Sequence, residues 1–288
     1  DKPIIEGFGF RQNDQEIAVG LQHEILPRVS VDFQFTHHWF GNFVASQDTL
    51  RPPSVYDPFC VTPATNFTIT SGYALPSTAQ LCGFMNRQPN TGANTFTNVT
   101  RASNFGDVSD VYTGYDLNVN ARLARGGIVS GGVSVGHEVT DICDVIGKAS
   151  VTYASVAGVL ASTSGTLAST TGYPSTLYCR VVPPYQPDWK GLVSYPLPWW
   201  DLRASATVQN RPGPQILANY TINAGNALTQ TTLGRTPTGG SQVTQLIAPN
   251  SIFGERFTQV DVRFGKGFKA GRSRIQGSLD LFNVFNSS

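Results

Sequence analysis

Along much of the chain, apolar and polar residues alternate with a period of two, as in a strand with one apolar and one polar face. In Val29–Trp39, for example, Val31 and Phe33 alternate with Asp32 and Gln34. Eight segments show this pattern: Glu16–Glu24, Val29–Trp39, Val111–Leu123, Val129–Thr140, Asp188–Tyr195, Leu202–Gln209, Gln259–Phe268 and Arg274–Asn283. The pattern therefore predicts an all-β, antiparallel chain of about eight strands.

The connections between these strands alternate between short and long. The short ones lie around 26–28, 125–127, 196–198 and 269–271, and the long ones cover about 41–110, 141–187 and 210–257. A compact domain rarely carries loops of that length. An outer-membrane β-barrel carries them regularly, with short periplasmic turns on one side and long extracellular loops on the other. We therefore expect residues 1–288 to form a single transmembrane β-barrel region.

Two further features favour a barrel in lipid. The polar faces of the strands are rich in Ser, Thr, Asn, Gln and Gly, as a wet lumen would be. Aromatic residues gather at the strand ends, as interfacial girdles do: Trp39, Phe40, Phe43, Tyr112, Tyr195, Trp199, Trp200, Phe282 and Phe285. A soluble β-sandwich with one solvated face would show the same alternation, so it stays open as the alternative fold.

Composition and charge exclude several classes. The net charge of +1 does not suit a phosphate backbone, which excludes generic nucleic-acid binding. Aromatic residues make up 11% of the chain, which excludes intrinsic disorder. Near the short turns, only two acidic residues, Glu24 and Asp201, accompany eight basic ones. The basic residues are Arg28, Arg122, Arg125, Arg203, Lys266, Lys269, Arg272 and Arg274. The simplest interpretation of this excess is that hairpin tips are solvated.

The C-terminal stretch carries a family resemblance. Its two strand motifs place particular residues at matching positions: Val260, Asp261, Arg263, Lys266 and Phe268, then Asp280, Asn283 and Asn286. These motifs resemble late barrel strands of TonB-dependent receptors. The segments 22–32, 56–62, 194–200 and 211–214 add a closer resemblance to Oar-like, TonB-dependent-receptor-like outer-membrane proteins.

That resemblance implies a bacterial outer-membrane protein that binds or takes up an unidentified ligand at the cell surface. Its family has a 22-stranded barrel, so the chain is expected to be the C-terminal part of a larger barrel. The implied partners are outer-membrane lipid, the remaining barrel and plug of a longer chain, a TonB-type energy-coupling protein and other surface proteins. Two alternatives stay open: a structural or adhesive surface protein anchored by the barrel, and a secreted β-sandwich glycoprotein. Four sequons would serve the last: Asn66, Asn98, Asn219 and Asn286.

The four cysteines fall in pairs within two of the long connections. Cys60 and Cys82 belong to the first, and Cys143 and Cys179 to the second. Pairing within each connection would close spans of 22 and 36 residues, and the periplasm and cell surface permit disulfides. We expect these two disulfides, although cross-pairing, free thiols and metal ligation are not excluded by the sequence.

One group of polar residues is expected to line the lumen. Its members carry both signs of charge: Asp32, Gln34, Asp116, Asn118, Arg122, Lys190, Arg203, Asp261, Arg263 and Asp280. Asp261, Arg263 and Asp280 lie on neighbouring strands, within cross-strand reach. We favour salt bridges across the barrel wall over direct contact with a substrate.

No enzyme and no cofactor are predicted. Gly132-Val-Ser134-Val-Gly136 matches a nucleophile elbow, but such an elbow needs a strand, a sharp turn and a helix, and here the alternation continues through Ser134. The run from Gly265 to Ala270 fits a dinucleotide fingerprint only superficially, because it leads into a hairpin. Adjacent His37 and His38 point to opposite faces of a strand, so they do not form a metal site together.

Overall fold

The computed structural model describes residues 11–62, 80–91, 97–146, 151–152, 176–199 and 201–285, so Asn66, Trp200 and Asn286 lie outside the described residues. Eight long strands form one antiparallel sheet in which each strand pairs with the next long strand along the chain. They are β1 (Asn13–Leu26), β2 (Val29–Gly41), β7 (Ser109–Arg122), β8 (Ile128–Asp141), β11 (Gln186–Pro196), β12 (Leu202–Arg211), β15 (Phe257–Ala270) and β16 (Ser273–Leu281).

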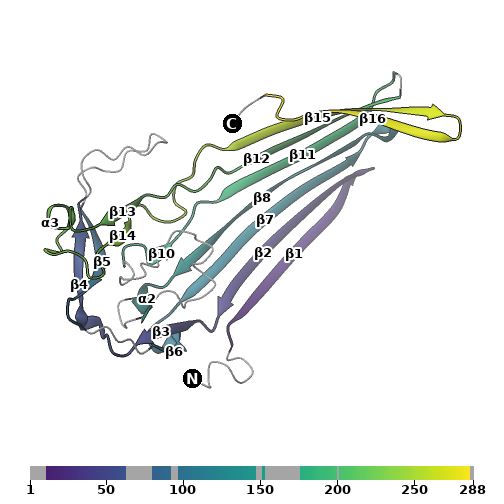
Figure 1. Cartoon of the computed structure of the whole chain (residues 1–288). Coiled ribbons are helices and arrows are strands. Elements are labelled where there is room, and N and C mark those ends of the chain that lie inside the picture. The colour runs from purple at the N-terminus through teal and green to yellow at the C-terminus, as the bar shows by residue number, and fades with distance from the viewer. Residues whose placement is uncertain are drawn as a thin grey trace.

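All eight strands predicted from the alternation are present, and the all-β, antiparallel fold class is confirmed. Short turns join β1 to β2, β7 to β8, β11 to β12 and β15 to β16, and all of them lie at one end of the sheet (Figure 1). The three long connections emerge at the other end (Figure 1). A short ninth strand, β10 (Arg180–Val181), pairs with the end of β8.

The strand register sorts the side chains into two faces, because residues directly opposite each other on antiparallel strands point to the same side. One row runs across five strands from Leu21 to Phe33, Leu117, Val133 and Trp189. The sheet therefore has one continuous apolar face and one polar face.

Shorter elements fill the long connections. The strands form three small sheets: β3 (Val44–Asp48) with β6 (Thr97–Arg101) and β9 (Val151–Thr152), β4 (Tyr56–Val61) with β5 (Leu81–Arg87), and β13 (Asn219–Ile222) with β14 (Gln242–Gln245). The helical turns are η1 (Pro53–Val55), η2 (Ala102–Asn104), η3 (Ala124–Gly126), α2 (Cys143–Ile146) and α3 (Ala227–Gln230). Among the described residues, no helix is long and apolar enough to cross a membrane.

The buried apolar residues lie outside the long strands. In the described part of the chain, no buried apolar side chain belongs to any of the eight strands of the main path. The larger cluster consists of Phe59, Val61, Phe84, Ala218, Tyr220, Ile222, Ala227, Leu246 and Ile247. A smaller one, Phe43, Ala45, Ala102 and Val145, joins the bases of the first and second long connections. The packed cores are thus in the connections.

Candidate functional site

All ten residues predicted to line a lumen lie on the polar face of the sheet. The register pairs Gln34 with Asp116, and Asp32 with Asn118. It continues this face through β8 and β11, where Asp116 lies opposite Ser134 and Ser134 opposite Asp188. Lys190, Arg203, Asp261, Arg263 and Asp280 follow on the same side. The sequence pattern therefore selected one contiguous surface.

Hydrogen bonds between neighbouring strands satisfy much of this polar face. Ser134 Oγ donates to Asp116 Oδ1, and Ser130 Oγ donates to Asn120 Oδ1 over 2.6 Å. On β11 and β12, Ser194 Oγ accepts from Ser205 Oγ at 2.9 Å and from Arg203 Nη1 at 3.3 Å. These contacts form a ladder that runs from strand to strand.

The three charged residues expected within cross-strand reach do not form one cluster. Arg263 and Asp280 are direct cross-strand partners and form an ion pair, with Nη2 donating to Oδ2 over 3.1 Å. Asp261 instead accepts from the Gln259 side-chain amide at 2.8 Å and from the Asn283 backbone N–H at 2.8 Å. The Arg263–Asp280 pair therefore links the end of β16 to β15, while Asp261 holds the segment just after β16.

Glycines on the polar face make room for large neighbours. A Cβ at Gly136 or Gly114 would collide with the Tyr112 ring, and these two glycines lie directly opposite each other. A Cβ at Gly132 would lie 2.6 Å from the Leu117 carbonyl oxygen and would also collide with the Asn118 side chain. The Gly132-x-Ser134-x-Gly136 motif is thus the middle of strand β8, and its glycines serve side-chain packing.

A second polar arrangement lies in a structure that we call the loop module, formed by β4, β5, β13, α3 and β14 around the larger apolar cluster. Arg235 donates from Nη2 to Asp57 Oδ2 at 2.8 Å and from Nη1 to Asn86 Oδ1 at 2.7 Å. Asn86 is fully buried, and its side-chain Nδ2 donates a hydrogen bond to Gln242 Oε1 at 2.7 Å. The hydrogen bonds with Arg235, and then with Gln88, hold the pKa of the Asp57 carboxyl below its usual value.

This network ties the first long connection to the third. Thr238 adds a backbone N–H to Asn86 Oδ1 at 3.0 Å, and the Arg87 carbonyl oxygen accepts from Arg235 at 2.9 Å. Backbone hydrogen bonds from Thr62 to Gln230 and from Thr232 to Cys60 continue the contact beside β4. Two connections that are far apart in sequence therefore fold as one unit.

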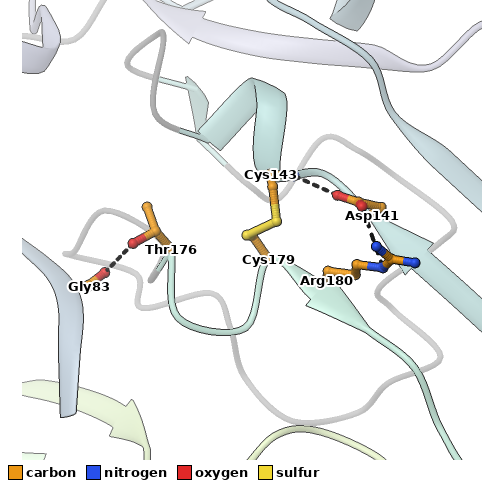
Figure 2. The surroundings of a disulfide bond; sticks show 6 residues. All are labelled: Gly83, Asp141, Cys143, Thr176, Cys179 and Arg180. Atoms are coloured by element: carbon orange, nitrogen blue, oxygen red, sulfur yellow. Dashed lines mark hydrogen bonds and ion pairs between the residues drawn. A yellow bond between two sulfur atoms is a disulfide. The ribbon is translucent and has the colours of Figure 1, made fainter.

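Both predicted disulfides are present and connect the cysteines within each long connection. Cys60–Cys82 links β4 to β5, and Cys143–Cys179 joins α2 to the segment before β10. Asp141 lies beside the second disulfide, where it accepts from the Cys143 N–H at 3.0 Å and lies 3.7 Å from Arg180 Nε (Figure 2).

The second connection also reaches the loop module. The Thr176 backbone N–H donates to the Gly83 carbonyl oxygen at 2.8 Å, a contact whose side-chain counterpart is drawn in Figure 2. Gly83 has a φ of +104°, and a Cβ there would lie 2.7 Å from Thr176 Oγ1. Burial raises the pKa of the nearby Tyr178 to about 12. All three long connections therefore meet at this end of the sheet.

Two features of this arrangement were not anticipated from the sequence. The apolar–polar alternation does not predict the loop module. The sequence signals for the module are the cysteine spacing and scattered apolar residues such as Phe59 and Phe84. Asp110, at the start of β7, is 1% exposed, and its carboxyl lies within hydrogen-bonding reach of the Glu138 side chain. No pattern in the sequence distinguishes it from the other aspartates.

These surfaces present hydrogen-bond donors, acceptors and charged groups. Within the described ranges, no group of three or more His, Cys, Asp or Glu side chains is arranged to hold a metal ion. A hollow of about 720 Å³ lies beside the β1–β2 turn, lined by Gln22, Glu24, Arg28, Asn120 and Arg122 among others.

Comparisons of the chain with protein-family models, with curated proteins and with solved structures find no match.

Proposed function

We propose that this chain forms part of the wall of a bacterial outer-membrane β-barrel of the TonB-dependent-receptor-like kind, which binds or takes up a ligand at the cell surface. The observation that carries the proposal is the exposed apolar face of the main sheet. Leu21 is 67% exposed, Trp189 53% and Leu279 59%, although each is at an apolar position of a long strand.

An apolar face of this extent is not stable against water. Soluble monomers rarely expose contiguous apolar patches larger than a few hundred Å², and this face extends across all eight long strands. Lipid would cover it, because hydrocarbon chains need no hydrogen bonds and leave the opposite polar face to a wet lumen. A β-sandwich would need a second sheet over the same face, but the small sheets described lie at one end of the long strands (Figure 1).

A membrane wall also needs its edges paired, because unpaired backbone groups are costly in hydrocarbon. In the described part of the chain, β1 and β16 each have one long-strand neighbour. Under this proposal their free edges pair with further strands of a larger barrel.

The loop module supports a role at the cell surface. Three long connections meet there: the Arg235 network and the apolar cluster join the first to the third, and the second, closed by Cys143–Cys179, reaches the first at Gly83. A cross-linked surface that gathers three loops suits ligand capture. The same cross-linking favours the second candidate, an adhesive surface protein that uses the sheet as its anchor and the module as its contact.

The test is heat-modifiability of the native protein on SDS gels, together with its intact mass. Faster migration of the unheated, detergent-extracted protein, with a mass far above 31.0 kDa, would support a wall within a larger closed barrel. Faster migration at 31.0 kDa would support a small self-closed barrel and count against the receptor. A heat-insensitive 31.0 kDa species that needs no detergent would refute the membrane proposal.

A further inference from the structure

The short-turn end of the sheet carries four cations that point away from the polar face or lie in the turns. Arg28, Arg125 and Arg272 lie in three of the turns and are exposed. Lys266 lies on the apolar face, where its Nζ lies 5.1 Å from the centre of the Phe268 ring. None of the four side chains forms an ion pair within the described residues.

Two of these arginines occupy backbone positions that arginine does not favour. Arg28 has a φ of +70° and Arg125 a φ of +59°. In this left-handed region glycine has no steric cost, and asparagine is the best tolerated of the other residues. A long, charged side chain with a Cβ at both sites therefore sacrifices turn stability, which indicates that the side chains serve another purpose.

The surroundings indicate what that purpose is. Arg28, Arg125 and Arg272 lie in turns that border the exposed apolar face, whereas Lys266 lies on that face between Phe264 and Phe268. Trp199, in the turn between β11 and β12, is 65% exposed. Basic residues and tryptophan at the boundary of an apolar surface are typical of contact with the headgroup layer of a membrane. Unpaired cations there complement the negative charge of anionic lipids.

We propose that the short-turn end binds the headgroups of anionic phospholipids, through Arg28, Arg125, Arg272 and Lys266. This inference rests on the proposed membrane function, because it assumes that the apolar face lies in lipid. It goes further because it names the residues that contact the lipid headgroups at this end of the sheet. It also explains why arginine is present at two positions with a left-handed backbone. The phosphates would be held by the guanidinium groups, which offer several donors in a planar fork.

The test compares Arg28→Asn/Arg125→Asn with the unmodified full chain in vesicle flotation. Partition is measured into phosphatidylcholine vesicles and into phosphatidylcholine–phosphatidylglycerol vesicles. The partition coefficient for the mixed vesicles is divided by that for phosphatidylcholine alone, and this ratio cancels the apolar contribution. Each neutralised arginine is expected to lower this ratio about fivefold, so the double variant lowers it about twenty-five-fold. The double variant should also unfold at a higher temperature, because asparagine suits both turns better.

The matched control is Arg180→Gln/Arg211→Gln, which removes the same charge at the other end of the sheet, where these side chains are 64% and 57% exposed. Its ratio should change less than twofold. An equal loss in both double variants, or a ratio near one for the unmodified chain, would overturn the inference. If heat-modifiability holds while the ratio is one, the headgroup contact is wrong and the barrel stands. If the chain binds neither vesicle and is heat-insensitive, both proposals fail.

Discussion

Arg235 and Asp57 are 178 residues apart in the sequence, yet Arg235 Nη2 donates to Asp57 Oδ2 over 2.8 Å. The pair joins the third long connection to the first, and the same guanidinium also binds the buried Asn86. The module's apolar cluster also draws on both connections, so the cluster and this contact hold the same two parts of the chain together.

Replacing Arg235 should therefore loosen the module while leaving the sheet intact. Arg235→Ala leaves the Asn86 carbonyl oxygen with one donor fewer and removes the charged partner of Asp57, which keeps its hydrogen bond from Gln88, at a cost of about 3 kcal/mol. Limited proteolysis should then cut within 50–90 and 215–250 faster than in the unmodified chain. Arg235→Lys keeps the charge without the fork and should fall between the two. Unchanged proteolysis of Arg235→Ala would show that the network is not needed.

The Asp57 carboxyl should make the module sensitive to acid. Its pKa is lowered in the folded state, so its contribution to stability is complete above the ordinary value of 3.8 and is lost as the pH falls through the lowered pKa. The hydrogen-exchange protection factors of β4 and β5, which are corrected for the pH dependence of intrinsic exchange, should fall below about pH 4. Asp57→Asn should be less stable at neutral pH and should lose this acid response. An identical acid response in the variant would assign it to other groups.

The two disulfides should differ modestly in their effect on stability. On the loop-entropy model, closing spans of 22 and 36 residues stabilises by about 3 and about 4 kcal/mol. Cys60→Ser/Cys82→Ser should expose β4 and β5 to protease. Cys143→Ser/Cys179→Ser should instead loosen the contact between Thr176 and Gly83. Thermal unfolding with and without reductant provides the check. Reductant should lower the unfolding temperature of each double variant, which keeps one disulfide, and should not change that of a variant with all four cysteines replaced.

Glycines within the strands should differ sharply in their tolerance of a side chain. At Gly132 a Cβ meets the Leu117 carbonyl oxygen at 2.6 Å, so Gly132→Ala should destabilise the sheet by about 1–3 kcal/mol. Gly267, also on the polar face, has no heavy atom within 4 Å of an added Cβ, so Gly267→Ala is the matched control and should be neutral. Equal unfolding temperatures for the two variants would contradict this packing.

Substitutions at two neighbouring positions of β1 should distinguish the environments of the two faces of the sheet. Leu21 belongs to the exposed apolar face and Gln22 to the polar face. If the apolar face lies in lipid, Leu21→Arg should hinder folding into vesicles by about 2–4 kcal/mol, whereas Gln22→Arg should have little effect. The heat-modifiable fraction after folding into vesicles measures both. Similar yields for the two variants would count against lipid on this face.

The sequence by itself determined the long strands, because alternation is a local property that repeats every two residues. It separated Phe33 from Gln34, and the register then placed each on the expected face. It also paired the cysteines correctly, since each pair lies within one connection and closes a short span. Arg263 and Asp280 were within reach for the same reason, because consecutive strands of a hairpin are neighbours.

Only the tertiary structure decided the loop module, since its contacts join residues with no local relation. Arg235 meets Asp57, and Asn86 meets Gln242, across gaps that no period or motif spans. The burial of Asp110 and the left-handed backbone at Arg28 and Arg125 likewise depend on neighbours and turn geometry. Local patterning fixes which face a side chain takes on a strand, whereas packing between distant connections depends on the three-dimensional arrangement of the whole chain.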